Sequence, residues 1–364
     1  MVGGIPGNAT QASGTQVSGT QVAATALGVE APSGPTGTFA VADSVELAAV
    51  ERSGFVESRH AGAAVVIGAD GEVIRAIGDV TSPMFPRSAM KPFQAVAVMA
   101  SGVTLRGEDA AIATASHSGS PHHVALVRGI LARADLPESA LGCPPAWPID
   151  PASRAEARRP GKDRSPVYME CSGKHAAMLV ACAQNNWSTS DYLEPEHPLQ
   201  KRILDVLERF TGERAVASGV DGCGTPVHAI SLAGLGRGIA RIATSKPGSP
   251  FAIYREAGEL ADAVRHNGWV VAGRGLPDTV VIDHLKIFAK GGAEGVMVAS
   301  AANGTTVAVK ILDGSRRAAT VVALSLLADA GAVQRSEVDA ILPELRLGIS
   351  GGGRQVGVIR PSYV

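Results

Sequence analysis

The chain has 364 residues, and its 33 Lys and Arg nearly balance its 34 Asp and Glu, for a formal net charge of −1. This balance argues against nucleic acid or an anionic membrane as a partner, because both bind basic surfaces. Hydrophobic residues make up 45% of the chain, which excludes a wholly disordered protein. The four Cys are too few for a disulfide scaffold, and no apolar run is long enough to predict a transmembrane helix.

The first 40 residues are rich in Gly, Ser, Thr and Ala and hold few large apolar side chains. Such a stretch cannot offset the entropy lost on ordering, so we expect a flexible tail over residues 1–40 and one folded domain over residues 41–364. The first residues also lack the basic segment and apolar core typical of a secretory signal. We therefore expect a cytoplasmic protein with reduced cysteines.

Strand patterns occur near both ends of the predicted domain. They cover residues 45–54, 63–68, 72–78, 294–300, 305–312 and 351–361. Two of the intervening turns, Asp70-Gly71 and Asn303-Gly304, have the sequence of tight hairpins.

Helical patterns fill the middle of the chain and recur once near its end. They cover residues 89–100, 122–136, 174–186, 197–212 and 315–331. Strands at both ends with helices between them favour an α+β fold, in which helices cover both faces of an antiparallel sheet.

The segment around Ser88 and Lys91 is the first candidate for chemistry. Pro92 lacks an amide proton and is tolerated only in the first turn of a helix, so a helix is expected to start at about Ser88. Residues three apart on that turn lie side by side. A lysine that is neutral could then act as the base that activates the serine hydroxyl. The alternative is structural, with Ser88 as a helix cap and Lys91 as a solvated residue of the first turn.

Two later segments extend this pattern. Ser116 lies in the run Ser-His-Ser-Gly, 28 residues after Ser88, and Lys290 precedes Gly291 and Gly292 near a late strand. In chain order the three elements resemble the signature of penicillin-binding proteins and serine β-lactamases, which favours a serine hydrolase. Two positions depart from that signature, with Ser118 in place of the usual Asn and Gly291 in place of the usual Thr.

Two cysteines and a lysine form a second candidate cluster. Cys171 and Lys174 are three residues apart before a predicted helix, and Cys223 lies in a loop rich in turn residues. Thiolates suit Zn²⁺, although a lysine binds a metal only as the neutral amine. The alternative is that both cysteines are buried free thiols. Cys182 has the surroundings of a core residue, and Cys143 has no partner in the pattern.

Six short segments together resemble one enzyme family. They are VESRH (56–60), FPRSAMKPFQ (85–94), ASHSG (115–119), CSGKHAAML (171–179), GVDGCGTP (219–226) and KGGAEGV (290–296). In this order, over roughly residues 44–361, they resemble the type II bacterial L-asparaginases of the Rhizobium etli class. The resemblance implies a fold similar to serine β-lactamases and glutaminases. It also implies hydrolysis of the side-chain amide of L-asparagine to L-aspartate and ammonia.

The resemblance assigns catalytic roles to four residues. Ser88 would be the nucleophile and Lys91 its proton acceptor. Ser116 and Lys290 would form a second Ser-Lys pair of the same site. A homodimer is also implied.

The resemblance assigns binding roles to six further residues. Those that would hold one Zn²⁺, with water as the fourth ligand, are Cys171, Lys174 and Cys223. Those that would line the substrate pocket are Arg87, His175 and Asp221. Asp221 would pair with the α-ammonium of the substrate and Arg87 with its α-carboxylate. One position departs from the family: Ser120 follows Ser-His-Ser-Gly where Glu is common, which changes the expected polarity of that loop.

The sequence leaves three other functions open. The same chemistry could act on glutamine or on a β-lactam. A zinc-bound hydroxide could attack the substrate, with Ser88 only a helix cap. A protein that binds an amino acid without turning it over would keep the pocket, but it would have no need of a nucleophile and two lysines.

Overall fold

The computed structural model describes residues 37–363, so all but the last four residues of the tail predicted over residues 1–40 lie outside the described residues. Phe39 is buried in the core, and ordered structure therefore reaches back to at least this residue. Within residues 37–363, no helix combines the length and hydropathy that crossing a bilayer requires.

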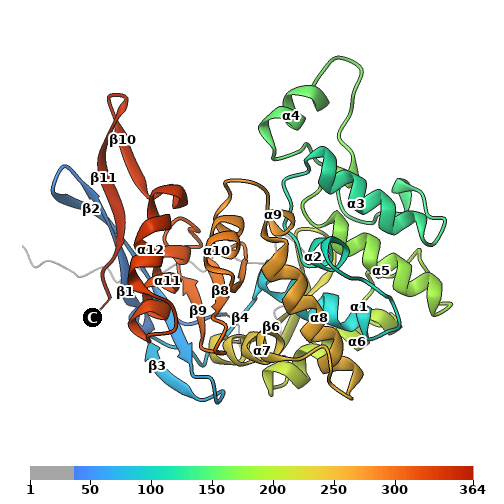
Figure 1. Ribbon diagram of the computed structural model, residues 1–364, viewed down its shortest axis with the longest axis horizontal. Coiled ribbons are helices and arrows are strands. Elements are labelled where there is room, and N and C mark those ends of the chain that lie inside the picture. The colour runs from blue at the N-terminus through green and yellow to red at the C-terminus, as the bar shows by residue number, and fades with distance from the viewer. Residues whose placement is uncertain (1–36, 364) are drawn as a thin grey trace, which may run out of the picture. The chain divides into compact units, whose positions relative to one another are not determined.

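The main sheet is antiparallel and joins the two ends of the domain. Its strands are β1 (Val45–Arg52), β2 (Phe55–Ile67), β3 (Val73–Ile77), β7 (Phe288–Gly291), β8 (Val296–Ser300), β9 (Thr306–Ile311), β10 (Gly348–Gly351) and β11 (Arg354–Pro361). Their order is β10-β11-β1-β2-β9-β8-β7, and β3 pairs with β2 away from this path. Figure 1 shows the blue N-terminal strands beside the red C-terminal ones, as the pairing of β1 with β11 requires.

Helices cover both faces of this sheet. All residues of β8 and β9 are buried, and successive side chains of a strand point to opposite faces, so neither face is open there. Helix α7 (Leu232–Thr244) packs against Val65 and Ile67 of β2 through Gly236, where a larger side chain would meet Ile67. Helix α11 (Ala319–Asp329) packs against β8, β9 and β11. The predicted α+β fold with a covered antiparallel sheet is confirmed.

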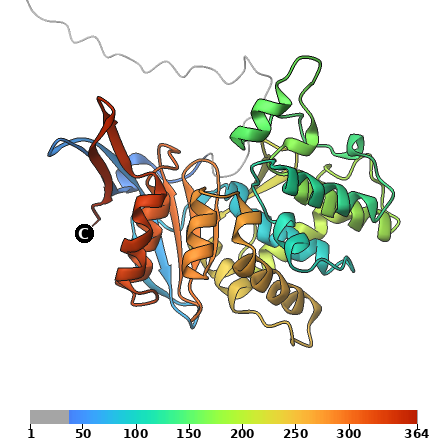
Figure 2. The ribbon, with the colours of Figure 1, turned by 45° about the horizontal axis from the view of Figure 1, so that its top comes forward.

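The middle of the chain forms a mainly helical part. Its helices are α1 (Lys91–Met99), α2 (Glu108–Ala113), α3 (Pro121–Ala132), α4 (Pro151–Ala157), α5 (Ser172–Gln184), α6 (Pro198–Thr211), α8 (Ala252–His266), α9 (Gly268–Val271) and α10 (Pro277–Leu285). In both ribbon views the green helices α3, α4 and α5 lie at the end of the domain away from the β10–β11 hairpin (Figure 2). The last helix, α12 (Arg335–Ile341), packs against α11.

The sequence did not predict a second, three-stranded sheet of order β4-β6-β5. Its strands are β4 (Pro83–Met84), β5 (Ala217–Val220) and β6 (Pro226–Ser231). Strands as short as two and four residues give too little alternation to be read from a sequence. This small sheet places the loop after β5 close to the segment that follows β4, which brings residues near 87 and 221 together.

We expect Gly173→Ala to destabilise the fold, because α5 approaches α2 closely at this glycine. An added Cβ would lie 2.6 Å from Ile112 Cγ1 and would also clash with the carbonyl oxygen of Ile112. Overpacking of this kind costs about 1–3 kcal/mol of unfolding free energy, measured by denaturant titration. Gly129→Ala is the matched control: Gly129 is exposed on α3 with nothing within 4 Å, so this variant should gain about 0.5–1 kcal/mol. Equal effects of the two substitutions would contradict the close approach.

Candidate active site

Ser88 and Lys91 lie at the junction between a 3₁₀ turn and α1. The turn spans Arg87–Met90. The sequence predicted a helix start at about Ser88, but the α-helix begins at Lys91. The amide of Lys91 bonds the carbonyl of Ser88, which is the i to i+3 pattern of a 3₁₀ turn. Side chains three apart eclipse in this geometry, so the change of helix type keeps the two residues on one side.

Strand β7 carries Lys290 to this turn from the far end of the chain. It lies at one edge of the main sheet, and the turn packs against β7 and β8. Gly292, directly after β7, makes the approach possible: a Cβ there would lie 2.8 Å from the carbonyl oxygen of Pro86 and 3.3 Å from the amide of Ala89. The glycine after Lys290-Gly291 is therefore required by the packing around Ser88.

The hydroxyl of Ser116 joins the two lysines. Lys91 Nζ lies 2.8 Å from Ser116 Oγ, and Lys290 Nζ lies 3.0 Å from the same oxygen. Lys91 Nζ also donates to the carbonyl of Ala115 at 2.6 Å. Within residues 37–363, no hydrogen bond joins the Lys91 amine to the Ser88 hydroxyl, and the two residues are linked by the backbone bond of their shared turn. The structure thus joins Lys91, Ser116 and Lys290 by hydrogen bonds and places Ser88 in the turn directly before Lys91.

His117 holds the segment that carries Ser116. Its Nδ1 accepts a hydrogen bond from the amide of Gly119 at 3.1 Å, so its Nε2 carries the proton and donates to Ser172 Oγ at 2.8 Å. Burial lowers the pKa of His117 well below its usual value, so the ring is neutral. The amide of Ser116 bonds the carbonyl of Val271 at 2.8 Å, which fixes the other side of the segment.

The lysines are removed from water, whereas the serines are more accessible. Lys91 and Lys290 are each 1% exposed, while Ser88 is 9% exposed and Ser116 is half-buried. Because both amines contact one oxygen, their nitrogens are at most about 5.8 Å apart. Two charges at that distance repel by about 3 kcal/mol at an effective dielectric constant of about 20. One amine is therefore expected to be neutral, and burial lowers the pKa of Lys290 to about 8 even though the Asp278 carboxylate opposes this change.

Arg87 and Asp221, two of the predicted pocket residues, form an ion pair next to Ser88. Arg87 Nε lies 2.7 Å from Asp221 Oδ1, and both side chains are partly buried. Arg87 has a φ of 51°, an uncommon conformation for a residue with a side chain. Backbone strain of this kind often occurs at functional sites. The pair presents opposite charges side by side, which complements a ligand that carries both an ammonium and a carboxylate.

Cys171, Lys174 and Cys223 converge as predicted. Lys174 Nζ and Cys223 Sγ both contact Thr225 Oγ1, at 2.8 and 3.2 Å. A hydrogen bond from the Cys171 thiol lowers the pKa of Cys223, and the ammonium of Lys174 acts in the same direction. The same hydrogen bond, together with burial, raises the pKa of Cys171. Although burial opposes it, the negative charge on Cys223 raises the pKa of Lys174.

This cluster has donors that fit a zinc ion. Within residues 37–363, no three His, Cys, Asp or Glu side chains are grouped to hold a metal, and the predicted set instead combines two sulfurs with an amine. Two soft sulfur donors and one nitrogen suit Zn²⁺, with one position left for another ligand. Lys174 would have to lose its proton to bind. The cluster adjoins the lysine pair, because Lys91 is near enough to lower the pKa of Cys171 in part.

His175, the third predicted pocket residue, lies behind the sulfurs. It is fully buried, and its Nδ1 lies 2.6 Å from the hydroxyl of Tyr192. That hydroxyl accepts a hydrogen bond from the amide of Gly142 at 2.8 Å, so it donates its own proton to His175 Nδ1. The proton of the neutral ring is then on Nε2, which lies near the Cys223 sulfur.

A family model described as L-asparaginase II matches residues 48–361, which is most of the chain. This chain belongs to the L-asparaginase II family. The family match agrees with the resemblance carried by the six sequence motifs. No curated protein matches the chain in a sequence comparison.

Several solved structures are distantly similar to this L-asparaginase II family member. A Bacillus glutaminase is 13% identical with a TM-score of 0.41, and the match covers 75% of this chain and 91% of the glutaminase. A β-lactamase from Mycobacterium bovis is 17% identical with a TM-score of 0.38, over 79% of this chain and 95% of the other. A protein named Mglu, in its native form, is 13% identical with a TM-score of 0.42, over 73% of this chain. This chain covers only 63% of Mglu, less than two thirds of its length.

Three residues near the site were not predicted from the sequence of this asparaginase family member. They are Asp278, Tyr192 and Thr225. Thr225 lies within the segment GVDGCGTP, so its motif was a usable signal, whereas Asp278 and Tyr192 lie outside all six segments. Their contacts depend on how helix α10 and the segment before α6 pack, which no local pattern reports.

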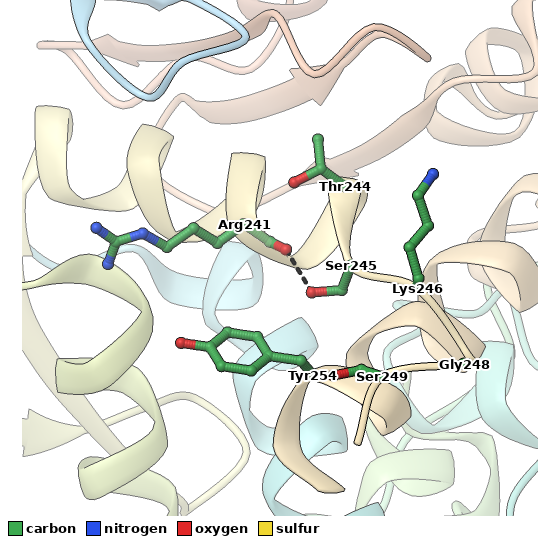
Figure 3. A pocket seen from close by; sticks show the side chains of 7 residues that line it. All are labelled: Arg241, Thr244, Ser245, Lys246, Gly248, Ser249 and Tyr254. Atoms are coloured by element: carbon green, nitrogen blue, oxygen red, sulfur yellow. Dashed lines mark hydrogen bonds between the residues drawn. The ribbon is translucent and has the colours of Figure 1, made fainter. Parts of the chain in front are cut away.

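Several surface cavities of the described residues are lined by none of the predicted site residues. One of about 640 Å³, drawn in Figure 3, lies between the end of α7 and the start of α8 and is lined by Arg241, Lys246 and Tyr254 among others. Helix α8 is about 22 Å long and its other end leads to α9 and Val271, so this cavity is far from Ser116. Another, of about 370 Å³, is lined by Ser118 and Ser120.

We expect Ser120→Ala to reduce stability without reducing turnover. Ser120 is the N-cap of α3: its Oγ accepts from the amide of His123 at 3.4 Å and contacts His123 Nδ1 at 2.7 Å. Loss of such a cap costs about 0.5–2 kcal/mol of unfolding free energy. Ser120→Asn, which can still cap the helix, should cost much less. A fall in kcat for Ser120→Ala with no change in thermal stability would contradict a capping role.

Proposed function

We propose that this protein hydrolyses the side-chain amide of L-asparagine to L-aspartate and ammonia through an acyl-enzyme on Ser88. The observation that carries the proposal is the contact of two buried lysine amines with the one hydroxyl of Ser116, next to the turn that bears Ser88. Neutral lysine beside a serine supplies a base, and a second, charged lysine supplies an acid. Membership of the asparaginase II family supports the substrate class.

In the first step, Ser88 Oγ forms a bond to the amide carbon while Lys91 Nζ takes the hydroxyl proton. The carbon–nitrogen bond then breaks, and the departing nitrogen takes the proton of the Ser116 hydroxyl and leaves as ammonia. Lys290 returns a proton to Ser116 through their hydrogen bond. The products of this step are ammonia and the ester of Ser88 with the aspartyl side chain.

In the second step, water attacks the ester carbonyl. The proton of the water passes to Ser116 and Lys290, and Lys91 returns its proton to Ser88 as the ester bond breaks. Both lysines then regain their starting protonation states. Assistance of this general acid–base type contributes about 10²–10⁴-fold to a rate.

The Arg87–Asp221 pair supports an amino acid as the substrate. Asp221 would bind the α-ammonium and Arg87 the α-carboxylate. Each would replace part of the present Arg87–Asp221 ion pair with a contact to the substrate. A simple amide carries no ammonium or carboxylate group that could pair with Asp221 and Arg87. The distance between this pair and Ser88 would then set the length of the side chain that reacts, which separates asparagine from glutamine.

We also propose that Cys171, Lys174 and Cys223 hold one Zn²⁺. The convergence of two sulfurs and an amine supports this proposal. When bound, the ion supplies a fixed positive charge that can anchor or orient the substrate. No proton in the steps above depends on it, because Ser88 is already the nucleophile. Metal analysis of the purified protein, with Cys223→Ala as control, tests the proposal; equal zinc in the two would refute it.

We expect Ser88→Ala to abolish ammonia release from asparagine. Removal of a nucleophile lowers kcat by about 10⁴-fold or more, and a coupled ammonia assay measures the loss. Ser245→Ala is the control, because Ser245 lines the cavity at the distant end of α8 and its hydroxyl donates to the carbonyl of Arg241. Release at the wild-type rate by Ser88→Ala would refute the acyl-enzyme. The same assay with asparagine, glutamine and a chromogenic β-lactam ranks the three by kcat/KM, and asparagine should be highest.

The rate should fall as the pH rises through about 8. Burial lowers the pKa of Lys290 to about 8, and only its protonated form can pass a proton towards the leaving ammonia. Because the group must be charged to act, activity is retained below this pH and lost above it. A pH profile of kcat measures the effect, and a profile that stays flat on both sides of pH 8 would contradict the role of Lys290.

A further inference from the structure

Asp278 contacts Lys290, one of the two lysines, from a helix that carries none of the predicted site residues. It lies in the first turn of α10 and is buried, with 6% exposed. Its Oδ2 accepts a hydrogen bond from the amide of Gly291 at 2.8 Å and lies 3.4 Å from Lys290 Nζ. Both contacts come from donors, so the geometry fits an ionised carboxylate.

Lys290 has three acceptors around its amine. They are Ser116 Oγ at 3.0 Å, the carbonyl of Gly291 at 2.7 Å and Asp278 Oδ2 at 3.4 Å. An ammonium has three donors and no acceptor, so this arrangement uses every one of its protons. A neutral amine would have to direct its lone pair at the Ser116 hydroxyl, because the carbonyl and the carboxylate have no proton to donate.

Lys91 has a different environment. Its amine contacts two acceptors, the carbonyl of Ala115 and Ser116 Oγ, and no carboxylate. A neutral amine can satisfy both with its two protons and keep its lone pair for the Ser88 hydroxyl. The two lysines share one serine oxygen, and the carboxylate lies beside only one of them.

We propose that Asp278 is a positioning residue that keeps Lys290 protonated. This inference rests on the proposed Ser88 mechanism, in which Lys91 is the base and Lys290 the acid. The charged groups that face Lys290 are Asp278 from α10, Lys91 from α1, Arg316 before α11 and Glu170 before α5. Of the two carboxylates, Asp278 is the one in contact with the amine, and the two cations both oppose its charge.

The absence of a side chain at Gly291 is a second observation that concerns the Asp278 carboxylate. A Cβ on Gly291 would lie 2.8 Å from Asp278 Oδ1 and 3.3 Å from Oδ2. The position where penicillin-binding proteins and β-lactamases usually carry Thr is therefore occupied here by the only residue that leaves room for Asp278. The carboxylate takes the space next to the lysine that the side chain would otherwise fill.

The test compares the pH dependence of kcat for wild type, Asp278→Asn and Gly291→Ala. Loss of an opposite charge in contact shifts a pKa by about 1–3 units. Without the anion the Lys290 ammonium is less favoured, so the alkaline limb should move by that amount to lower pH, with activity partly retained on the acidic side. Gly291→Ala displaces the carboxylate and should shift the limb in the same direction. Asp283→Asn, the same change to a half-buried carboxylate of α10, should leave the limb in place.

A second readout separates failure of this inference from failure of the proposed function. Lysines labelled with ¹³C at Cε are titrated by NMR, and Lys290→Met assigns the Lys290 signal. The signal should titrate near pH 8 in the wild type and about 1–3 units lower in Asp278→Asn, whether or not asparagine is hydrolysed. An unshifted signal in a folded Asp278→Asn variant would overturn the inference, as would a lower kcat with an unchanged pH limb. Absence of ammonia release by the wild type would instead overturn the proposed function.

Discussion

The site depends on one oxygen, that of the Ser116 hydroxyl, which lies within hydrogen-bond distance of two buried lysine amines. Two ammonium groups at this separation repel each other, and burial adds a desolvation cost, so the state with one charged and one neutral amine is favoured. A base and an acid are thereby produced from two residues of the same type. The serine between them can pass a proton because it both donates and accepts.

The fold creates this contact by joining its helical part to the edge of its sheet. Lys91 comes from the start of α1, Ser116 from the segment after α2, and Lys290 from β7, the outermost strand. Gly292 allows the end of β7 to lie against the turn of Ser88, and Gly291 makes room for Asp278. Each of these two consecutive glycines is therefore required by a different close contact. Cys171 and Lys174 of the thiol cluster lie at the start of α5, near enough to Lys91 for its charge to act on Cys171.

The sequence predicted the elements with strong periodicity and the residues that share a turn. The hairpins around Asp70-Gly71 and Asn303-Gly304 and the helices α1, α3, α5, α6 and α11 lie where their patterns indicated. Ser88 and Lys91 were readable because Pro92 restricts where the helix can start, although the turn proved to be 3₁₀. The joining of Ser116 to Lys290, 174 residues apart, was implied by family resemblance and not by any local pattern.

What the sequence could not provide was the packing of elements without local signals. Asp278 is one carboxylate among 34 acidic residues, and its contact with Lys290 exists only because α10 packs on β7. The small sheet that pairs Arg87 with Asp221 has strands too short to recognise. Residues 1–36 of the predicted tail lie outside the described residues, and the zinc ion, the homodimer and the cytoplasmic location stay predictions.

The most direct test of the account is covalent trapping with a diazoketone analogue of asparagine, followed by peptide mapping with mass spectrometry. Attack by the activated hydroxyl should leave one adduct per chain, on Ser88, and labelling should be much slower in Lys91→Met and in Ser116→Ala. An adduct on Ser116 or Cys223, or undiminished labelling of Ser88 in Lys91→Met, would contradict the account.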